Sequence, residues 1–475
     1  MFASTLRYHN GTFYLISSWA SKELGTPQYA LSTTNNPYDN LAWSNVKWLE
    51  TPGLTIDPDI FFDDDGSVIL SSAGDPIIAM YLDLDTGKTS EPWNLWEGTG
   101  GSSPEGPHIY KKDGFYYLLI AEGRTQLNHS ATIARSTSLK GPWEPSPHNP
   151  LVSNRDTDDY FQTVGHADLF QDSRGNWWGV ALSTRGGPRL YRDLIQPLGR
   201  ETVLFPVSWL SGHWPIADRA QGNMTGPLPQ SSVISQGVGP TVGLPDVVDF
   251  ETGSAIPSHW VSWRAPFDAN DLTVSPRESR NTLRLTSSRA NLTTDSIFNA
   301  TKEGVTALFR RQEHTYFNFS VNIHLGFGTS NGHEVGVSNF ALPDQHVDIG
   351  IVYLKNDKME LLPNFRLRAR SVNAYPLPPE IIKPISKEWC LGEIEIQISS
   401  NNETHCDVYA RKGHEEIKVG SYSKALLTSD GATSGGVLGV YATQNGGQRT
   451  FYGYVSKWRY SPVAQKIGYK EVIKI

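Results

Sequence analysis

The sequence contains few of the residues that would build a disulfide scaffold, a cysteine metal cluster or a membrane span. Its 475 residues include only two Cys and four Met, which excludes a disulfide-rich fold and a cysteine-based metal cluster. No run approaches the roughly 18 apolar residues that a membrane span requires. Charged residues make up only 19% of the chain, and 41 basic against 49 acidic side chains leave a net charge of −8. This acidic balance argues against nucleic acid or an anionic membrane as the main partner.

The residues that are abundant indicate β structure. The chain has 14 Trp, 20 Tyr, 43 Gly and 30 Pro, a composition typical of turn-rich sheets with aromatic surfaces. Its length is sufficient for two to four domains at roughly 100–200 residues each. We therefore expect an all-β protein of more than one domain.

Signals for the cellular compartment disagree. The opening MFASTLRYHNGTFYLI alternates like a strand and has no apolar h-region, so we expect no signal peptide in this chain. Glycosylation sequons, which would suit a secreted protein, occur at Asn10, Asn128, Asn223, Asn291, Asn299, Asn318 and Asn402. The alternation in YFNFSVNIHL predicts that Asn318 lies on the solvent face of a half-buried strand. Whether any sequon is glycosylated stays open.

An uncharged stretch divides the chain into two halves. From Gln221 to Pro245 the sequence has no charged residue and is dense in Gly, Pro and Ser, which is typical of a linker. We predict a first domain over residues 1–222, a linker over 223–246 and a second domain over 247–475. The second domain alternates in TLRLT, HVDIGIVYL, EIEIQI, CDVYAR and VLGVYA, a pattern that favours an antiparallel sandwich.

The first half contains a repeated hairpin. The segments LRYHNGTFYLI, IFFDDDGSVIL, IYKKDGFYYLL and LFQDSRGNWWGV each join two apolar strands through a turn glycine, namely Gly11, Gly66, Gly114 and Gly175. Asn-Gly and Asp-Gly turns between such strands are strong hairpin signals. Repetition of a sheet unit at this spacing predicts β-propeller blades. The alternative is an ordinary all-β domain with unrelated hairpins.

One register of this repeat contains residues suited to catalysis. The residues nine positions before the turn glycines are Phe2, Asp57, Glu105 and His166. In a propeller, this register faces the central axis at one end, so two carboxylates and an imidazole would converge. Paired carboxylates in a pocket are the groups that hydrolyse glycosides, although acidic residues near strand starts more commonly solvate loops. We expect Glu105 to be the proton donor, since its longer side chain reaches further, and Asp57 to raise its pKa.

Several segments resemble glycoside hydrolase family 43, specifically its β-xylosidase and α-L-arabinofuranosidase group: IDPDIFFDDDG, EGPHIYKKDGFYYLLIAEG, GHADLFQDSRGNWW and PLGRET. The resemblance implies a five-bladed β-propeller followed by a concanavalin A-like β-sandwich. It also implies that Glu105 is the general acid, that Asp57 orients it and raises its pKa, and that Arg200 binds sugar hydroxyls. By the same resemblance, His166 is a polar group on the axis and Thr125 lines the pocket.

The resemblance further implies a substrate, a stereochemistry and a compartment. The substrate would be a xylo-oligosaccharide or an arabinose-substituted hemicellulose, from which a terminal pentose is hydrolysed with inversion. No nucleic acid or membrane partner and no organic cofactor are implied, although some relatives hold a cation on the axis beside His166. The parent family acts outside the cell. Xylose versus arabinose specificity and the oligomeric state stay open.

The chain departs from the family pattern at its beginning. Relatives open with a blade whose PDP-type motif supplies the general base, and no such blade precedes Met1-Phe2-Ala3-Ser4 here. We therefore expect an N-terminally incomplete propeller of about four blades with one of two principal catalytic carboxylates. Without a base, a rate factor on the order of 10²–10⁴ is lost, so we predict little hydrolysis. The alternatives are a non-catalytic carbohydrate-binding remnant and a fragment from a mis-started gene model.

Overall fold

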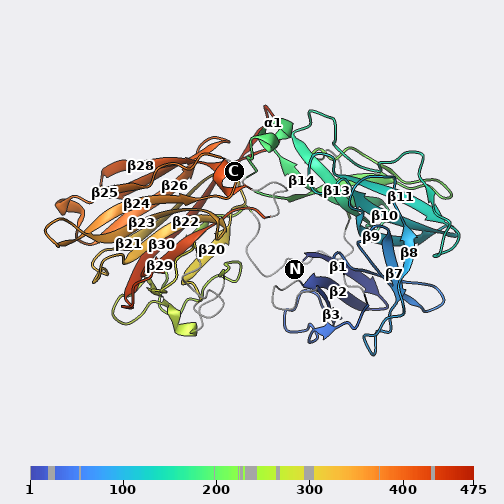
Figure 1. Ribbon diagram of the computed structural model, residues 1–475, viewed down its shortest axis with the longest axis horizontal. Coiled ribbons are helices and arrows are strands. Elements are labelled where there is room, and N and C mark those ends of the chain that lie inside the picture. Colours follow the sequence, from blue (N-terminus) through green and yellow to red (C-terminus); the bar gives the residue numbers. More distant parts are fainter. Residues whose placement is uncertain are drawn as a thin grey trace. The chain divides into compact units, whose positions relative to one another are not determined.

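The computed structural model describes residues 2–19, 27–52, 55–196, 198–222, 224, 228–230, 243–263, 268–293, 304–373, 375–428 and 434–475. The chain divides into two compact units, of which the first comprises residues 1–188 and 201–237 and the second residues 189–200 and 238–475. Within the described ranges, regular structure is nearly all strand, with α1 (Gly187–Arg192) as the α-helix (Figure 1). No helix in this part of the chain is long and apolar enough to cross a membrane.

The first unit contains four sheets of four antiparallel strands, and each sheet is formed by strands consecutive in sequence. The first sheet consists of β1 (Phe2–His9), β2 (Thr12–Trp19), β3 (Gln28–Thr34) and β4 (Lys47–Trp48). The second consists of β5 (Asp59–Phe62), β6 (Val68–Ser72), β7 (Ile77–Tyr81) and β8 (Trp93–Trp96). The third consists of β9 (Glu105–Lys112), β10 (Phe115–Glu122), β11 (Ser130–Ser136) and β12 (Glu144–Pro145). The fourth consists of β13 (Phe161–Gln171), β14 (Trp177–Arg185), β15 (Glu201–Ser208) and β16 (Ile216–Ala217).

The repeated hairpins are the first two strands of each sheet. The turn glycines adopt left-handed backbone conformations, with φ of 81° at Gly11, 87° at Gly66, 79° at Gly114 and 81° at Gly175. A residue without Cβ adopts this conformation at little cost, which is why glycine recurs there. The two-residue turns at Gly11 and Gly114 also have positive φ at the preceding residue, as type I′ hairpins require. The hairpin predictions are therefore confirmed.

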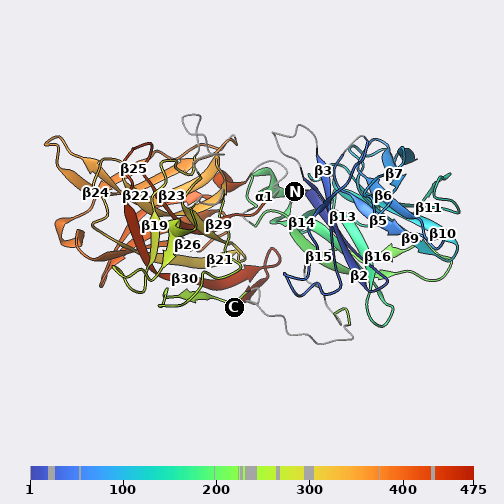
Figure 2. The ribbon, with the colours of Figure 1, turned by 90° about the horizontal axis from the view of Figure 1, so that it is seen from below.

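Three apolar cores join these sheets in chain order. One core joins the first and second sheets through residues such as Ile16 and Leu70. Another joins the second and third through Ile69 and Leu118, and the last joins the third and fourth. Sheets that pack face to face in succession around an axis are the blades of a propeller (Figures 1 and 2).

The first sheet exposes apolar side chains on the face that does not contact the second sheet. Leu6 is 49% exposed, Tyr8 64%, Trp19 45% and Trp48 43%. On the paired strands, Tyr8 stands opposite Phe13 and Leu6 opposite Leu15, on one face of the sheet. Ile16, the residue after Leu15, points to the other face and is fully buried against the second sheet. Alternate residues of a strand point to opposite faces, so one face of this blade is packed and the other is open.

The second unit contains two sheets. The larger sheet consists of β17 (Asp246–Val248), β18 (Leu272–Val274), β19 (Leu283–Thr286), β21 (Tyr316–His324), β26 (Glu393–Ser400), β27 (His405–Lys412), β28 (Glu415–Ser423), β30 (Tyr452–Lys466) and β31 (Val472–Lys474). The smaller sheet consists of β20 (Ala307–Arg311), β22 (Glu334–Leu342), β23 (Gln345–Lys355), β24 (Leu361–Arg370), β25 (Ile381–Pro384) and β29 (Val437–Thr443). Short 3₁₀ turns are η1 (Ala269–Asp271), η2 (Lys387–Trp389) and η3 (Lys424–Leu427).

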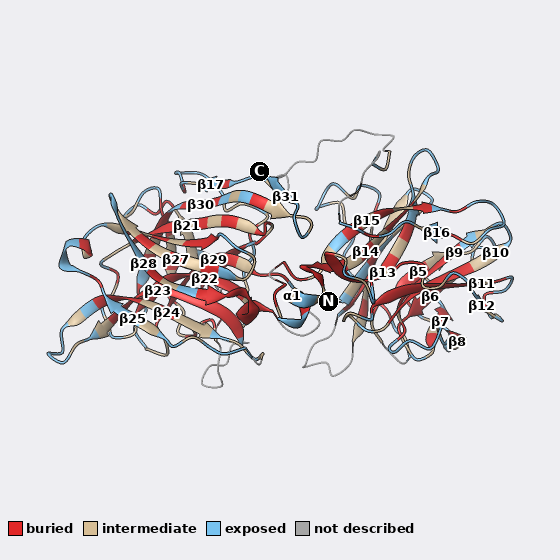
Figure 3. Cartoon of the chain, turned by 90° about the horizontal axis from the view of Figure 1, so that it is seen from above, coloured by how far each residue is buried: buried red, intermediate tan, exposed pale blue. Residues whose placement is uncertain are grey.

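Both sheets contribute to one apolar core, as expected for a sandwich. Phe319 and Ile396 of the larger sheet and Val337 and Ile351 of the smaller sheet are fully buried in it. Figure 3 shows buried residues alternating with less buried ones along β21 and β30 of the larger sheet, whereas β22 of the smaller sheet is buried along most of its length. Asn318 alternates with buried neighbours as predicted, but it is only half-buried, and its Oδ1 accepts hydrogen bonds from the adjacent strand β26.

Part of the sequence prediction falls outside the described residues. Most of the expected linker lies there, as do the sequons Asn223 and Asn299. The last residue of the expected linker, Asp246, is described, and it begins β17 opposite Tyr460. The domain boundaries stay a prediction.

Candidate active site on the propeller axis

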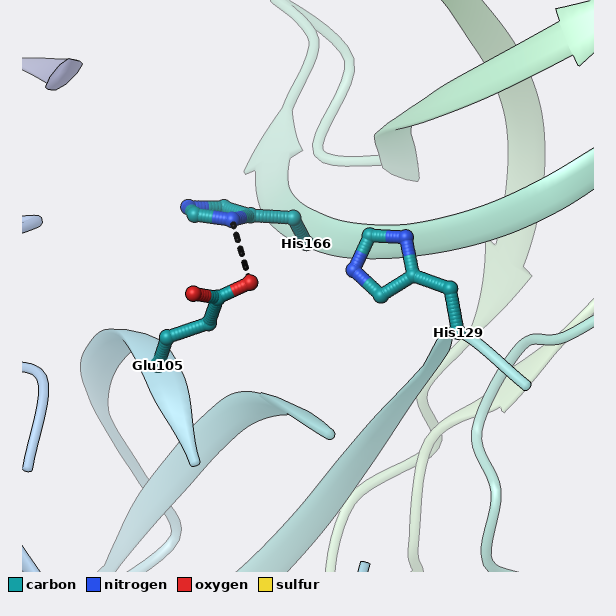
Figure 4. Close-up of side chains that lie close together, drawn as sticks. All are labelled: Glu105, His129 and His166. Atoms are coloured by element: carbon teal, nitrogen blue, oxygen red, sulfur yellow. Dashed lines mark ion pairs between the residues drawn. The ribbon is translucent and has the colours of Figure 1, made fainter. Parts of the chain in front are cut away.

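Glu105 and His166, from different blades, meet at one end of the propeller. Glu105 is the first residue of β9, and His166 lies within β13. The distance from His166 Nδ1 to Glu105 Oε1 is 4.0 Å, and the two side chains are 13% and 17% exposed. His129, the residue before β11, joins them, since ligand atoms of all three residues lie within 4.8 Å of one another (Figure 4). The register of the repeat therefore brings Glu105 and His166 together as expected. His129, which does not belong to this register, adds a second imidazole.

Two glycines make room for the two imidazole rings. A Cβ on Gly106 would lie 2.5 Å from His166 Nε2, and a Cβ on Gly165 would lie 2.5 Å from His129 Cδ2. No real Cβ approaches an atom so closely, so any larger residue would displace a ring. The glycines of the EGPH and VGHAD segments are thus required by the neighbouring side chains.

Strand β13 is irregular where it passes the site. Its pairing with β14 shifts register between Gln162 and Gly165 and again between Gly165 and Asp168. Thr163 and His166 have φ of 56° and 52°, a left-handed conformation that is uncommon outside glycine. Bulges of this kind re-aim side chains and are frequent beside active sites. The backbone strain here is therefore tied to the direction of the His166 side chain.

Asp57 lies just before its inner strand. It is 5% exposed, has φ of 57°, and stands two residues before β5. A buried carboxylate in a left-handed conformation is a strained arrangement that persists only when its surroundings hold it. The structure therefore places Asp57 in a constrained position, while its action on Glu105 stays a prediction.

A layer of charged side chains crosses the axis next to this site. Arg7 of β1 donates from Nε and Nη2 to Asp59 at 2.8 and 2.7 Å, and its Nη1 lies 3.1 Å from Asp168 Oδ2. His108 Nδ1 lies 3.2 Å from Asp59 Oδ2. Tyr110 donates a hydrogen bond to Asp168. Because Arg7 Nη2 also lies 2.9 Å from His108 Nδ1 of β9, this one side chain of β1 links the inner strands of four blades.

The charges in this layer stabilise one another. Burial alone would raise the pKa of Asp59, which is 1% exposed, but the charge of Arg7 and the contact with His108 lower it to about 2. Burial likewise opposes ionisation of Asp168, and the charges of His108 and Arg7 lower its pKa below the ordinary value. Both carboxylates are therefore ionised at neutral pH.

This layer contains residues that the motifs discussed above did not identify, namely Arg7, Asp59, His108 and Asp168. His108, three residues after Glu105 on β9, contacts Asp59 and Arg7. A signal was present in the sequence: Asp59 follows Asp57 by two residues, as Asp168 follows His166. The two aspartates occupy equivalent positions of β5 and β13, and the structure brings both against Arg7.

The remaining predicted site residues are more dispersed. Thr125 lies half-buried in the turn between β10 and β11. Phe2 begins β1 opposite Ser18 and is 48% exposed. Arg200 directly precedes β15 and is half-buried, and it belongs to the second compact unit, whereas Glu105 belongs to the first. The roles of Thr125, Phe2 and Arg200 in binding sugar stay predictions.

Glu105, His129 and His166 offer an oxygen and two nitrogen ligand atoms, close enough together to hold one metal ion. His129 Nδ1 lies 2.9 Å from the Thr163 carbonyl oxygen. A carbonyl can only accept, so Nδ1 carries the proton and Nε2 keeps its lone pair in the neutral ring. The donor set thus fits a cation. A carboxylate bound to a metal cannot also donate a proton, so the two roles of Glu105 exclude each other.

Family models match both halves of the chain. Residues 1–215 match "Glycosyl hydrolases family 43", and residues 247–461 match "Beta xylosidase C-terminal Concanavalin A-like domain". A non-reducing end α-L-arabinofuranosidase of Bacteroides ovatus is 31% identical over 463 residues, covering 94% of this chain and 79% of that protein. A xylosidase/arabinosidase of Butyrivibrio fibrisolvens is 29% identical, covering 94% and 83%.

Solved structures agree with these matches. The Bacteroides ovatus xyloglucan PUL GH43B protein superposes with a TM-score of 0.80 at 28% identity, covering 97% of this chain and 85% of that one. A xylan β-1,4-xylosidase of Bacillus halodurans superposes with a TM-score of 0.77 at 24% identity, covering 97% and 86%, and shows the shared fold. With the repeated blades, the sandwich and the Glu105 site, these matches lead to one conclusion: the chain belongs to family 43 of the glycosyl hydrolases.

Proposed function

We propose that this chain hydrolyses terminal pentose residues of hemicellulose, as a glycosidase of the β-xylosidase or α-L-arabinofuranosidase type. The observation that supports this best is the meeting of Glu105 with His166 at 4.0 Å on the propeller axis. Names of the relatives that cover most of the chain point to the same pentoses. Which of the two pentoses is preferred depends on pocket walls formed by loops.

Glu105 has the surroundings of a proton donor. Its side chain is 17% exposed, so it is largely withdrawn from water yet open to a substrate oxygen. A general acid must hold its proton until the glycosidic bond breaks. In the proposed reaction Glu105 protonates the leaving oxygen, Asp57 keeps its pKa high, and Arg200 binds sugar hydroxyls. A water molecule attacks the anomeric carbon from the opposite side as the bond to the leaving oxygen breaks, and the proton released by the water passes to bulk solvent, so the sugar is released with inversion.

The proposal is tested by replacing the acid. Glu105→Gln keeps the size of the side chain and removes its proton donor, so release of xylose or arabinose from aryl glycosides should fall by about 10²–10⁴-fold. Glu97→Gln is the matched control, because Glu97 is exposed in the segment that leads to β9 and should have no effect. Equal rates in Glu105→Gln and the unaltered chain would refute the assignment.

Calorimetry separates turnover from binding alone. Titration of the chain with xylobiose, beside the activity assay, tests the alternative of a non-catalytic binding protein. Heat of binding together with sugar release supports the glycosidase, whereas binding with no release at any enzyme concentration supports the alternative.

We propose that the reaction needs no metal ion and no organic cofactor. The support is the competition described above, since Glu105 serves either as a proton donor or as a ligand. Activity should therefore be unchanged after dialysis against EDTA. A loss that added Ca²⁺ restores would assign an essential cation to the two imidazoles.

We also propose that the protein degrades xylan-type polymers outside the cell. Exposed sequon residues such as Asn10, Asn128 and Asn402 support this. Protein isolated from its native source should then lose mass on treatment with an N-glycan-removing enzyme, and an unchanged mass would contradict the proposal.

A further inference from the structure

His129 is the member of the axial cluster that neither the proposed reaction nor the sequence motifs use. It is 1% exposed and lies between β10 and β11, in the loop that follows Gly123. Its Nδ1 donates to the carbonyl oxygen of Thr163 at 2.9 Å, which fixes the ring orientation and the tautomer. The acceptor belongs to one of the two left-handed residues of β13. His129 therefore contacts a neighbouring blade at its most strained point.

The ring of His129 also fills the space beside Gly165. A Cβ built on Gly165 would lie 2.5 Å from Cδ2, 2.6 Å from Cγ and 2.7 Å from Nε2 of His129, so the ring packs directly on that backbone. Gly165 lies between the two register shifts of β13 and directly precedes His166. The His129 side chain thus hydrogen-bonds to Thr163, and it packs on Gly165, the residue directly before His166.

We propose that His129 is a positioning residue, which holds segment 163–166 of β13 so that the His166 imidazole stays beside Glu105. This inference rests on the proposed function, because it assigns His129 a role in the same site. His129 acts through the backbone of β13 and takes no proton from the substrate. Figure 4 shows the His129 ring beside the side chains of His166 and Glu105.

Two substitutions separate the hydrogen bond of His129 from its volume. His129→Asn places an amide nitrogen near the position of Nδ1 and can still donate to Thr163, whereas His129→Leu fills space but donates nothing. We expect His129→Leu to lower kcat by about 10–10²-fold, as misplacement of about 1 Å does, and His129→Asn to retain most of it. His148→Asn is the matched control, since His148 is exposed and near the same sheet.

Leaving-group dependence distinguishes positioning from a general loss of stability. A displaced acid harms substrates with poor leaving groups, which need a proton, more than activated dinitrophenyl glycosides, which do not. His129→Leu should therefore show the larger loss on the poor substrate with KM little changed. Equal losses on both substrates, or equal losses in the Leu and Asn variants, would overturn the proposal.

A spectroscopic measurement makes the test independent of turnover. In ¹⁵N-histidine-labelled protein at neutral pH, His129 should give the long-range pattern of the Nδ1–H tautomer, and His129→Leu should shift the ring signals of His166 while His129→Asn shifts them less. An Nε2–H tautomer, or unchanged His166 signals in the Leu variant, would refute the positioning role.

Gly165→Ala tests the same contact from the other side if His129→Leu fails to fold, and it should shift the same His166 signals. If Glu105→Gln leaves activity unchanged while these signals behave as expected, only the proposed function fails.

Discussion

At the scale of single residues, buried ion pairs hold the inner strands of the propeller together at its axis. Arg7 bonds Asp59 and Asp168, while Asp59 is almost wholly removed from water. Removing one partner of a buried ion pair leaves the other charge unpaired, which costs far more than the pair itself contributes. The stability of the propeller should therefore respond strongly to Arg7.

Arg7→Met should lower the free energy of unfolding of the first unit by about 3–5 kcal/mol, because Met preserves the length of the chain but leaves Asp59 without a guanidinium. Urea unfolding followed by Trp fluorescence measures the change. Arg174→Met, at an exposed arginine in the β13–β14 turn, should change it by less than about 1 kcal/mol. Equal midpoints for the two variants would contradict the prediction.

The lowered pKa of Asp59 predicts a dependence of stability on pH. The folded state favours the ionised carboxylate, with a pKa of about 2 against an ordinary value of 3.8. Its contribution, about 2 kcal/mol at one pKa unit per 1.36 kcal/mol, is present above pH 4 and is lost as the pH falls toward 2. Asp59→Asn should flatten this part of the profile, whereas Asp64→Asn, at a side chain 84% exposed, should not.

Gly106 and Gly114 offer a comparison within one strand region. Both have positive φ, so alanine at either position costs about 1–2 kcal/mol of backbone strain. Only at Gly106 would the new Cβ meet the His166 ring, since nothing lies within 4 Å of that point at Gly114. Gly106→Ala should therefore abolish most sugar release while Gly114→Ala leaves it intact, and similar activity in both would contradict this assignment.

At the scale of elements, three adjacent strands of the sandwich share a buried charge cluster. Glu334 of β22 is fully buried and contacts Arg366 of β24, with Tyr441 Oη donating to it at 2.8 Å. Asp348 of β23 is bonded by Arg368 at 3.0 Å. Burial opposes ionisation of Glu334, but the charges of Arg366 and Arg368 hold its pKa below the ordinary value. The cluster therefore links the strands through side chains as well as through the backbone ladder.

Arg366→Met should lower the free energy of unfolding of the second unit by about 3 kcal/mol, since Glu334 stays buried and loses its nearest cation. The matched control is Glu380→Gln, because Glu380 is a half-exposed partner of the same arginine at 3.7 Å. This surface pair should contribute about 0–1 kcal/mol. Guanidinium-induced unfolding measures both free energies. The same change for the two variants would show that burial of an ion pair does not determine how much its loss destabilises the unit.

At the scale of the whole molecule, the first blade of the propeller has one packed face and one open face. The open face carries apolar side chains such as Tyr8, which is 64% exposed. Low activity of this chain stays a prediction.

A small anionic nucleophile tests the prediction of low activity, because it can attack without a general base. Azide or formate needs no deprotonation to attack the anomeric carbon, so it should raise cleavage of activated aryl glycosides above a low basal rate, by up to about 10²-fold. Glu105→Gln, assayed on a substrate with a poor leaving group, should lose the remaining rate. Rapid hydrolysis without added nucleophile, abolished by Glu105→Gln, would show that the chain has a working base.

The hairpins, the sandwich strands and the pairing of Glu105 with His166 were predictable because they depend on local patterns. An Asn-Gly or Asp-Gly turn sets its own geometry, alternation sets which face of a strand is buried, and equal register in repeated blades brings equivalent positions to one axis. The contacts of Arg7 and His129 were not predictable in this way. Both reach across blades, and nothing near them in sequence identifies their partners.

The sequence by itself determined the all-β architecture, the blade repeat and the place of Glu105 at the start of its inner strand, since period and turn chemistry act over a few residues. Only the tertiary structure decided that His108 joins Asp59, that His129 packs on Gly165, and that Arg7 links four blades. The physical reason is twofold. Bulges change which residues of β13 face the axis, and buried charged groups pair with whichever opposite charge lies nearest in space. Separation along the chain does not limit that choice.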